Sequence, residues 1–163
     1  MPYIIETKRL GMRPFERDDG EVFFRLNNDP EVMQYTGDIP FKSIEESERF
    51  IANYDHYQEH GYGRWTVVLK QTGTVIGWCG LKYHMEGYVD IGYRLLRSEW
   101  GNGYGTEAAQ ACLDFGRMHI SNLPIWGRVS KDNIGSIRVL EKIGMQYFKS
   151  AECGAIQDSL YYR

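Results

Sequence analysis

The chain has 163 residues and a formal net charge of −3, with 42% hydrophobic and 25% charged residues. This composition is typical of a globular protein, and no apolar run approaches the ~20 residues that a membrane-spanning helix requires. The acidic balance argues against a nucleic-acid partner, because proteins that bind nucleic acids gain much of their affinity from basic surfaces. The amino-terminal residues lack the basic and apolar regions of a signal peptide. We therefore expect one domain over residues 1–163, located in the cytoplasm, with no nucleic-acid or membrane partner.

The cysteine and histidine patterns indicate no metal centre. Cys79, Cys112 and Cys153 are widely spaced and form no Cys-x-x-Cys motif. His56 and His60 could share one face of a helix, but no third ligand follows nearby. The sequence predicts no metal site and no dependence on disulfides.

The amino-terminal part begins with a predicted strand within residues 8–15, where apolar and polar residues alternate. Asp18 or Asp19 can then cap a short helix that ends before Pro30. Ser43 starts a capping-box pattern, and apolar residues recur with helical spacing to about His60. These signals predict one long helix over that second stretch.

The remaining elements follow from turn residues and changes of periodicity. Further strands are predicted over 65–69, 75–83, 88–96, 125–129, 145–151 and 159–162, with helices over 103–120 and 134–143. The strand pairs joined by tight turns imply antiparallel pairing, and the helix after residue 103 can cross over to a parallel neighbour. The order indicates an α/β (α+β) fold with a mixed, mostly antiparallel central sheet of about seven strands and about four helices.

The most informative segment is Trp100–Thr106, in which three glycines occupy alternate positions between a strand and a helix. Glycine lets main-chain N–H groups converge without obstruction by Cβ, and a helix N-terminus adds a partial positive charge. Both features favour binding of an anionic phosphate. The Gly-Lys-Ser/Thr of a Walker loop is absent, and the acid of a dinucleotide fingerprint is missing downstream. A tight turn with no ligand remains an alternative.

Three segments together resemble one family. The run from Gly92 to Ala108 resembles the acetyl-CoA motif of the GNAT superfamily of N-acetyltransferases, in particular the RimJ/RimL-like branch of ribosomal-protein N-terminal acetyltransferases. Residues 7–15 are similar to the first strand of that branch, and residues 133–145 to its second cofactor-side motif. Position 100 is Trp where the motif usually has Gln or Arg.

The resemblance implies a GNAT-like fold, acetyl-CoA as cosubstrate, and loop amides that bind the CoA pyrophosphate. The cofactor-binding residues that it implies are Arg94, Leu95, Leu96, Trp100, Gly101, Asn102, Gly103, Tyr104, Gly105, Thr106 and Asn133.

Two catalytic residues are also implied by the resemblance. Asp90 lies near the position of the family's glutamate base, and could act through a water or be only a solvated strand carboxylate. Ser136 aligns with a serine proposed as an acid, and is equally natural in the first turn of a helix. Leu140 stands where many members have a tyrosine acid. Cys112 lies on an apolar helix face and is expected in the core, which favours direct transfer over a covalent acyl-enzyme.

The sequence thus predicts an acetyl-CoA-dependent N-acetyltransferase that acts on a primary amine. The preferred acceptor is an α-amino group of a peptide, protein or small molecule. An α-amine, with a pKa of about 7.7–8.0, is far more often neutral than a lysine amine, with a pKa of about 10.4. Alternatives are a polyamine or aminoglycoside acetyltransferase and a catalytically silent CoA-binding module. The acceptor side would be formed by residues 28–41, the helix over 43–60 and the strands joined by a short connection at 152–158. Tyr35, Trp65 and Tyr83 could line it, but each could equally lie in the core. A homodimer is left open.

Overall fold

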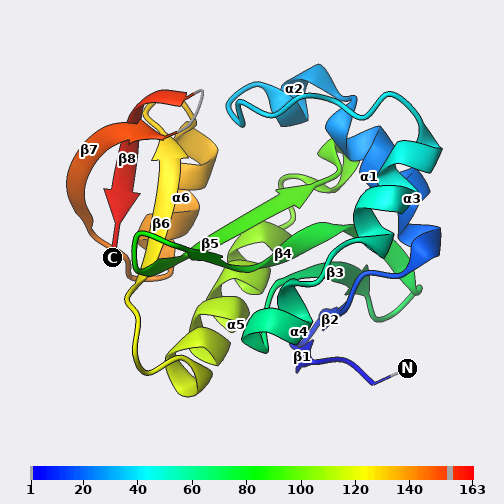
Figure 1. The fold of residues 1–163 in the computed structure, drawn as a ribbon, viewed down its shortest axis with the longest axis horizontal. Helices are drawn as coiled ribbons and strands as arrows, with labels where there is room; N and C mark the ends of the chain where they lie inside the picture. Colours follow the sequence, from blue (N-terminus) through cyan, green and yellow to red (C-terminus); the bar gives the residue numbers. More distant parts are fainter. Residues whose placement is uncertain (1, 154–155) are drawn as a thin grey trace.

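The computed structural model describes residues 2–153 and 156–163, which form one eight-stranded sheet with helices against both faces (Figure 1). The strand order is β1-β2-β3-β4-β5-β6-β8-β7; β5 and β6 pair in parallel, and the other strand pairs of the described residues are antiparallel. The mixed, mostly antiparallel sheet is as predicted. The strands are β1 (Ile5–Glu6), β2 (Leu10–Arg13), β3 (Arg64–Leu69), β4 (Thr74–His84), β5 (Tyr88–Leu95), β6 (Ile125–Ser130), β7 (Tyr147–Cys153) and β8 (Ile156–Tyr162).

The helices lie in two groups on opposite faces of the sheet. Tyr93 on β5 points to the face where it packs against Gly105, and the next residue, Arg94, points to the other face and contacts Asn27. None of the described helices is long and apolar enough to cross a membrane. The helices are α1 (Gly20–Asn27), α2 (Pro30–Met33), α3 (Ile44–Ala52), α4 (His56–His60), α5 (Tyr104–His119) and α6 (Ile134–Lys142), with 3-10 turns η1 (Arg17–Asp19) and η2 (Arg97–Glu99).

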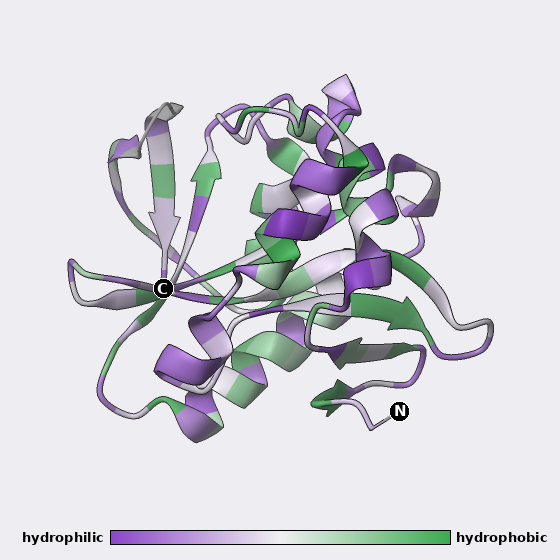
Figure 2. Ribbon diagram, turned by 45° about the vertical axis from the view of Figure 1, so that its right-hand side comes forward, coloured by the Kyte–Doolittle hydropathy of each residue, from purple (hydrophilic) through white to green (hydrophobic). Residues whose placement is uncertain are grey.

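The core lies mainly between the sheet and α5, whose Ala108, Cys112 and Leu113 are buried. Figure 2 shows hydrophobic residues along the central strands and hydrophilic residues on the outer turns of the helices. The Cys112 thiol lies 3.5 Å from the Met12 sulfur across this layer, and burial raises its pKa. A buried thiol with a raised pKa is a poor nucleophile, which fits the expected core role.

The predicted long helix from Ser43 to His60 is instead two helices, α3 and α4. The start is as expected, since the Ser43 hydroxyl accepts the Glu46 N–H at 3.1 Å. The chain leaves the helix at Asn53, and the hydroxyl of Tyr54 accepts the N–H of Arg64 at 2.8 Å. Aromatic residues on both sides of the break pack in one cluster. The helical spacing of apolar residues therefore continues across the break, and the sequence pattern does not reveal it.

Two other elements differ from the prediction. Helix α1 ends before Pro30, but this proline begins α2, with Asp29 Oδ1 accepting the Glu31 N–H at 3.0 Å. Proline suits the first turn of a helix because an N–H there has no intrahelical partner. The eighth strand, β1, has two residues, too few to give a periodic signal.

Candidate active site

Strands β5 and β6 diverge and open a fork in the middle of the sheet. They pair at only three positions, the last being Ile91 with Gly127, after which β6 pairs with β8 (Figure 1). The Val89 N–H donates to the Pro124 carbonyl on the β6 side, and the Leu96 N–H donates to the Ile76 carbonyl on the β4 side. Because main-chain groups alternate along a strand, those of residues 93 and 95 face the fork.

This alternation divides the predicted cofactor contacts on β5. Leu95 faces the fork, although its carbonyl accepts the Trp100 indole N–H at 3.0 Å. The Leu96 N–H is engaged with β4, as described, and the side chain of Arg94 lies on the opposite face in a salt bridge to Asp38 at 2.7 Å. Tyr93, which the prediction did not include, has main-chain groups that face the fork.

The glycine loop leads directly into α5, a helix of 16 residues. Gly101 and Gly103 have φ values of 82° and 80°, a left-handed conformation that favours glycine. The N-cap is Gly103, which has no side chain that could cap the first amides of the helix. Those amides are free of intrahelical partners by geometry and carry the positive end of the helix dipole. The loop therefore has the geometry of an anion site, at the end of the fork.

Arg9 from the first hairpin lies beside this loop. Its guanidinium is 4.5 Å from the centroid of the Tyr104 ring and donates from Nε to Glu107 at 2.8 Å. A Cβ at Gly103 would lie 3.4 Å from Arg9 Nη2. A positive side chain thus flanks the amides, although the sequence alone did not place it there.

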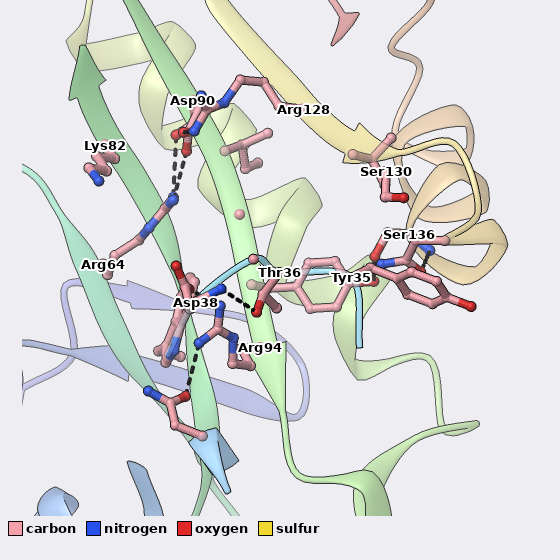
Figure 3. Close-up of a pocket in the computed structure, with 18 of the residues that line it drawn as sticks. Tyr35, Thr36, Asp38, Arg64, Lys82, Asp90, Arg94, Arg128, Ser130 and Ser136 are labelled. Atoms are coloured by element: carbon pink, nitrogen blue, oxygen red, sulfur yellow. Dashed lines mark hydrogen bonds and ion pairs between the residues drawn. The ribbon is translucent and has the colours of Figure 1, made fainter. Parts of the chain in front are cut away.

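A cleft of about 760 Å³ opens at the fork. Its lining includes residues of α6 and of the segment after α2, among them Ser136 and Tyr35 (Figure 3). Tyr35 therefore lines the cleft as expected. Trp65 is instead 2% exposed in the core, and Tyr83 stacks on His60 outside the cleft. Residues 154–155 of the predicted short connection lie outside the described part of the chain.

Asp90 lies at the apex of the fork and is only 3% exposed. Its carboxylate contacts Arg64 at 2.7 Å, His84 at 2.6 Å and Arg128 at 2.8 Å (Figure 3). Burial raises the pKa of Asp90, but the positive charges of Arg64 and Arg128 and the hydrogen bond to His84 together hold it well below its usual range. Gly92 makes room for this cluster, because a Cβ there would lie 3.1 Å from Arg64 Nη2.

Ser136 lies in the first turn of α6, where the Asn133 side chain accepts its N–H at 3.2 Å. Asn133 is thus the expected N-cap, and both residues line the cleft. The Ser136 hydroxyl lies 3.4 Å from the hydroxyl of Tyr93. Burial raises the pKa of Tyr93, so its hydroxyl stays protonated at neutral pH. The two hydroxyl groups bridge β5 and α6 across the fork.

Sequence reasoning missed the partners of the two predicted catalytic residues. Arg64 and Arg128 come from strands distant in sequence, and only the sheet register brings them to Asp90. Tyr93 carried one available signal: it alternates with Gly92 and Arg94, so it had to point toward the helix that follows the glycine loop.

Comparison with known proteins gives a consistent result. A family model described as an acetyltransferase (GNAT) domain matches residues 9–146. YkkB of Bacillus subtilis is 38% identical over 150 residues, which cover 88% of this chain and 86% of that protein. The spermidine N(1)-acetyltransferase of Escherichia coli K12 is 25% identical over 142 residues, covering 82% of this chain and 70% of that enzyme.

Solved structures show the same fold. An acetyltransferase (GNAT family) from Bacillus anthracis superposes with a TM-score of 0.79 at 30% identity, covering 97% of this chain and 95% of that one. RimL, a ribosomal L7/L12 α-N-protein acetyltransferase in complex with coenzyme A, superposes with a TM-score of 0.75 at 17% identity, covering 96% and 93%. At that identity the second likeness shows the fold alone.

Proposed function

The chain belongs to the GNAT acetyltransferase family and is an N-acetyltransferase of that type, and we propose that it transfers an acetyl group from acetyl-CoA directly to an α-amino group. The observation that carries this proposal is the fork between β5 and β6, which leads from the glycine loop to a cleft of about 760 Å³. The fork offers main-chain groups to an extended arm, the loop offers amides to phosphates, and the cleft offers room for an acceptor.

The residues at the loop fit the cosubstrate. Gly101, Asn102, Gly103 and the first residues of α5 would hold the pyrophosphate through main-chain amides, as in other helix-terminus phosphate sites. The relative RimL was solved as a complex with coenzyme A, which supports this assignment. In this proposal Trp100 holds the loop to β5 through its indole N–H rather than contacting phosphate.

The chemical step needs a neutral amine and a proton for the departing thiol. The amine nitrogen attacks the thioester carbonyl carbon, so a C–N bond forms and the C–S bond breaks. Solvent takes the proton that the amine loses. We assign the proton for the thiolate to the hydroxyl pair of Tyr93 and Ser136, which lie 3.4 Å apart and would be reprotonated from solvent.

We propose that Asp90 positions neighbouring side chains and does not act as a base. A carboxylate whose pKa is held so low is a weak base, and its two oxygens already bind Arg64, His84 and Arg128. It holds the two guanidinium groups at the apex of the fork. In this assignment the direct or water-linked base role predicted from sequence is not needed, because a free α-amine is already partly neutral at physiological pH.

A polyamine acceptor is the second candidate, because one relative is a spermidine N(1)-acetyltransferase. The test has two parts. Isothermal titration with CoA should show binding, and no heat at millimolar CoA would contradict the proposal. Thiol release from acetyl-CoA should then depend on an added amine. Binding without turnover on any amine would indicate a silent CoA-binding module.

A further inference from the structure

The lining of the cleft carries more positive than negative side chains. Among the described residues its charged lining consists of four basic and two acidic side chains, and burial lowers the pKa of His56, which disfavours its charged form. The chain as a whole has a net charge of −3, so the positive lining is a local feature. The basic residues are Arg64, Lys82, Arg94 and Arg128, and the acidic ones are Asp38 and Asp90.

The two carboxylates do not offer a site for a cation. Asp38 is paired with Arg94 at 2.7 Å, and this arginine also donates to Asn27 at 2.9 Å. Asp90 is surrounded by Arg64, His84 and Arg128, as described above. A polycation entering this cleft would meet carboxylates already neutralised by guanidinium groups, with surplus positive charge around them.

The surplus charge lies close to the fork. Lys82 is directly opposite Asp90 in the β4–β5 register, so it stands on the same face of the sheet. It is exposed, and Figure 3 shows it beside the group formed by Asp90 and Arg64. Asp90 is one residue before Ile91, the last β5 position paired with β6. Arg64 and Arg128 therefore contact this carboxylate, and Lys82 lies opposite it in the neighbouring strand, next to the place where β5 and β6 diverge.

Resting on the proposed acetyl transfer, we propose that the acceptor is an amine that also carries a carboxylate, and that Arg64, Lys82 and Arg128 form the surface that recognises it. The carboxylate would neutralise the surplus charge on binding. The same cations lower the pKa of a nearby ammonium group, because like charges disfavour its protonated form. A positive cleft thus both selects the acidic acceptor and keeps its amine nucleophilic.

Two sources could supply this chemistry, a free amino acid or the acidic N-terminus of a peptide. The test measures kcat/KM for pairs that differ in one carboxylate: alanine against alaninamide, and Asp-Ala-Ala-amide against Asn-Ala-Ala-amide, with spermidine as a cationic reference. Each value is expressed per concentration of neutral amine, because a carboxylate raises the pKa of a nearby ammonium group. We expect the acid of at least one pair to exceed its neutral partner and spermidine by tenfold or more, equivalent to about 1.4 kcal/mol. The pair that shows this preference identifies the source. The preference should shrink as salt is raised, because ions screen the charges.

Charge reversal at Lys82 provides the variant. Lys82→Glu should reduce the preference for the acid at least tenfold, mainly by raising the KM of the acid. The kcat/KM values of the acid and of its neutral partner should then be more similar. Arg117→Glu, with the same change in net charge at an exposed position outside the cleft lining, should keep the wild-type preference. An equal effect of both variants would overturn the proposed surface.

The outcomes separate this inference from the proposed function. Transfer to the neutral amides or to spermidine at rates equal to those of the acids would leave acetyl transfer standing and overturn the acidic acceptor. Absence of transfer to any amine would overturn the proposed function. The inference is then decided by binding alone: in the presence of CoA, titration with acetylalanine and acetyl-Asp-Ala-Ala-amide should give at least one affinity tenfold above that of the matched neutral compound, and equal affinities in both pairs would overturn it.

Discussion

The buried carboxylate of Asp90 lies between side chains from three other strands: Arg64 on β3, His84 on β4 and Arg128 on β6. Removing one partner from such a buried group leaves the others with uncompensated charge, at a cost of about 3 kcal/mol or more. The cluster therefore links side chains of three strands to Asp90 at the point where β5 and β6 separate. It stabilises both the apex of the fork and the charge of the Asp90 carboxylate.

This arrangement predicts a particular loss of stability in acid. Unfolded Asp90 has a pKa of about 3.9, and its folded pKa is lower. Its contribution is therefore fully present above about pH 4 and is lost as the pH falls through and below that value. Urea unfolding from pH 7 to pH 3 should show a steeper loss for the wild type than for Asp90→Asn, which should already be less stable at pH 7. Equal slopes would contradict the lowered pKa.

The kinetics of the same variant distinguish the two roles of Asp90. If Asp90 only holds the guanidinium groups, Asp90→Asn should raise KM for the acceptor and leave the pH profile of kcat unchanged. A fall in kcat that is relieved at high pH, as the amine loses its proton to solvent, would instead identify Asp90 as the base.

The hydroxyl pair gives a second prediction at this scale. Tyr93→Phe and Ser136→Ala should each lower kcat about tenfold or more, because each removes part of the proposed proton donor for the thiolate. The double variant should lose less than the product of the two effects, since the groups act as a unit. Tyr147→Phe, which removes an exposed hydroxyl bonded to Ser150, serves as the control. Independent, additive effects would argue against a shared role.

At the scale of elements, the glycine loop owes its shape to backbone conformation. Gly103→Val should weaken CoA binding by well over tenfold, because valine disfavours the left-handed conformation that aims the amides. Gly73→Val is a matched control, since Gly73 has a similar φ of 75° in the β3–β4 turn with open space around it. Calorimetric titration of both variants with CoA measures the effect. An unchanged affinity in folded Gly103→Val would show that the loop is only a turn.

Elements were predictable from sequence where a signal is local. The α6 boundaries follow from Asn133 and from Gly144, whose φ of 91° suits a residue after a helix. The break between α3 and α4 was not predictable, because Tyr54 keeps the helical spacing while its hydroxyl bonds to Arg64. Contacts such as that between Asp90 and Arg128 depend on register between strands that are distant in sequence, which no local pattern reports.

At the scale of the whole molecule, the parallel pairing of β5 with β6 through α5 separates two surfaces. The face covered by α5 carries the side chain of Tyr93 and the start of α6, while the opposite face carries Asp90, Arg94 and the segment after α2. Direct transfer requires both substrates to meet across the sheet at the fork, and the burial of Cys112 is consistent with the absence of an acyl-enzyme step.

The effect of CoA on the stability of the folded protein tests whether the whole molecule contains a CoA site. CoA at 100 times its Kd should stabilise the folded state by about 2.7 kcal/mol, which raises Tm by roughly 5–10 °C for a chain of this size. Differential scanning with and without CoA measures the shift. A saturating concentration that leaves Tm unchanged would contradict a CoA site in the folded protein.

The most direct test of the account uses one peptide that offers both kinds of amine. The peptide begins with a free α-amino group on aspartate and carries one internal lysine. After incubation with the protein and acetyl-CoA, tandem mass spectrometry locates the acetyl group. The account predicts acetylation at the α-amino group alone, because that amine is more often neutral and lies beside a carboxylate that the cationic cleft can bind. Acetyl groups found on the lysine alone would contradict it.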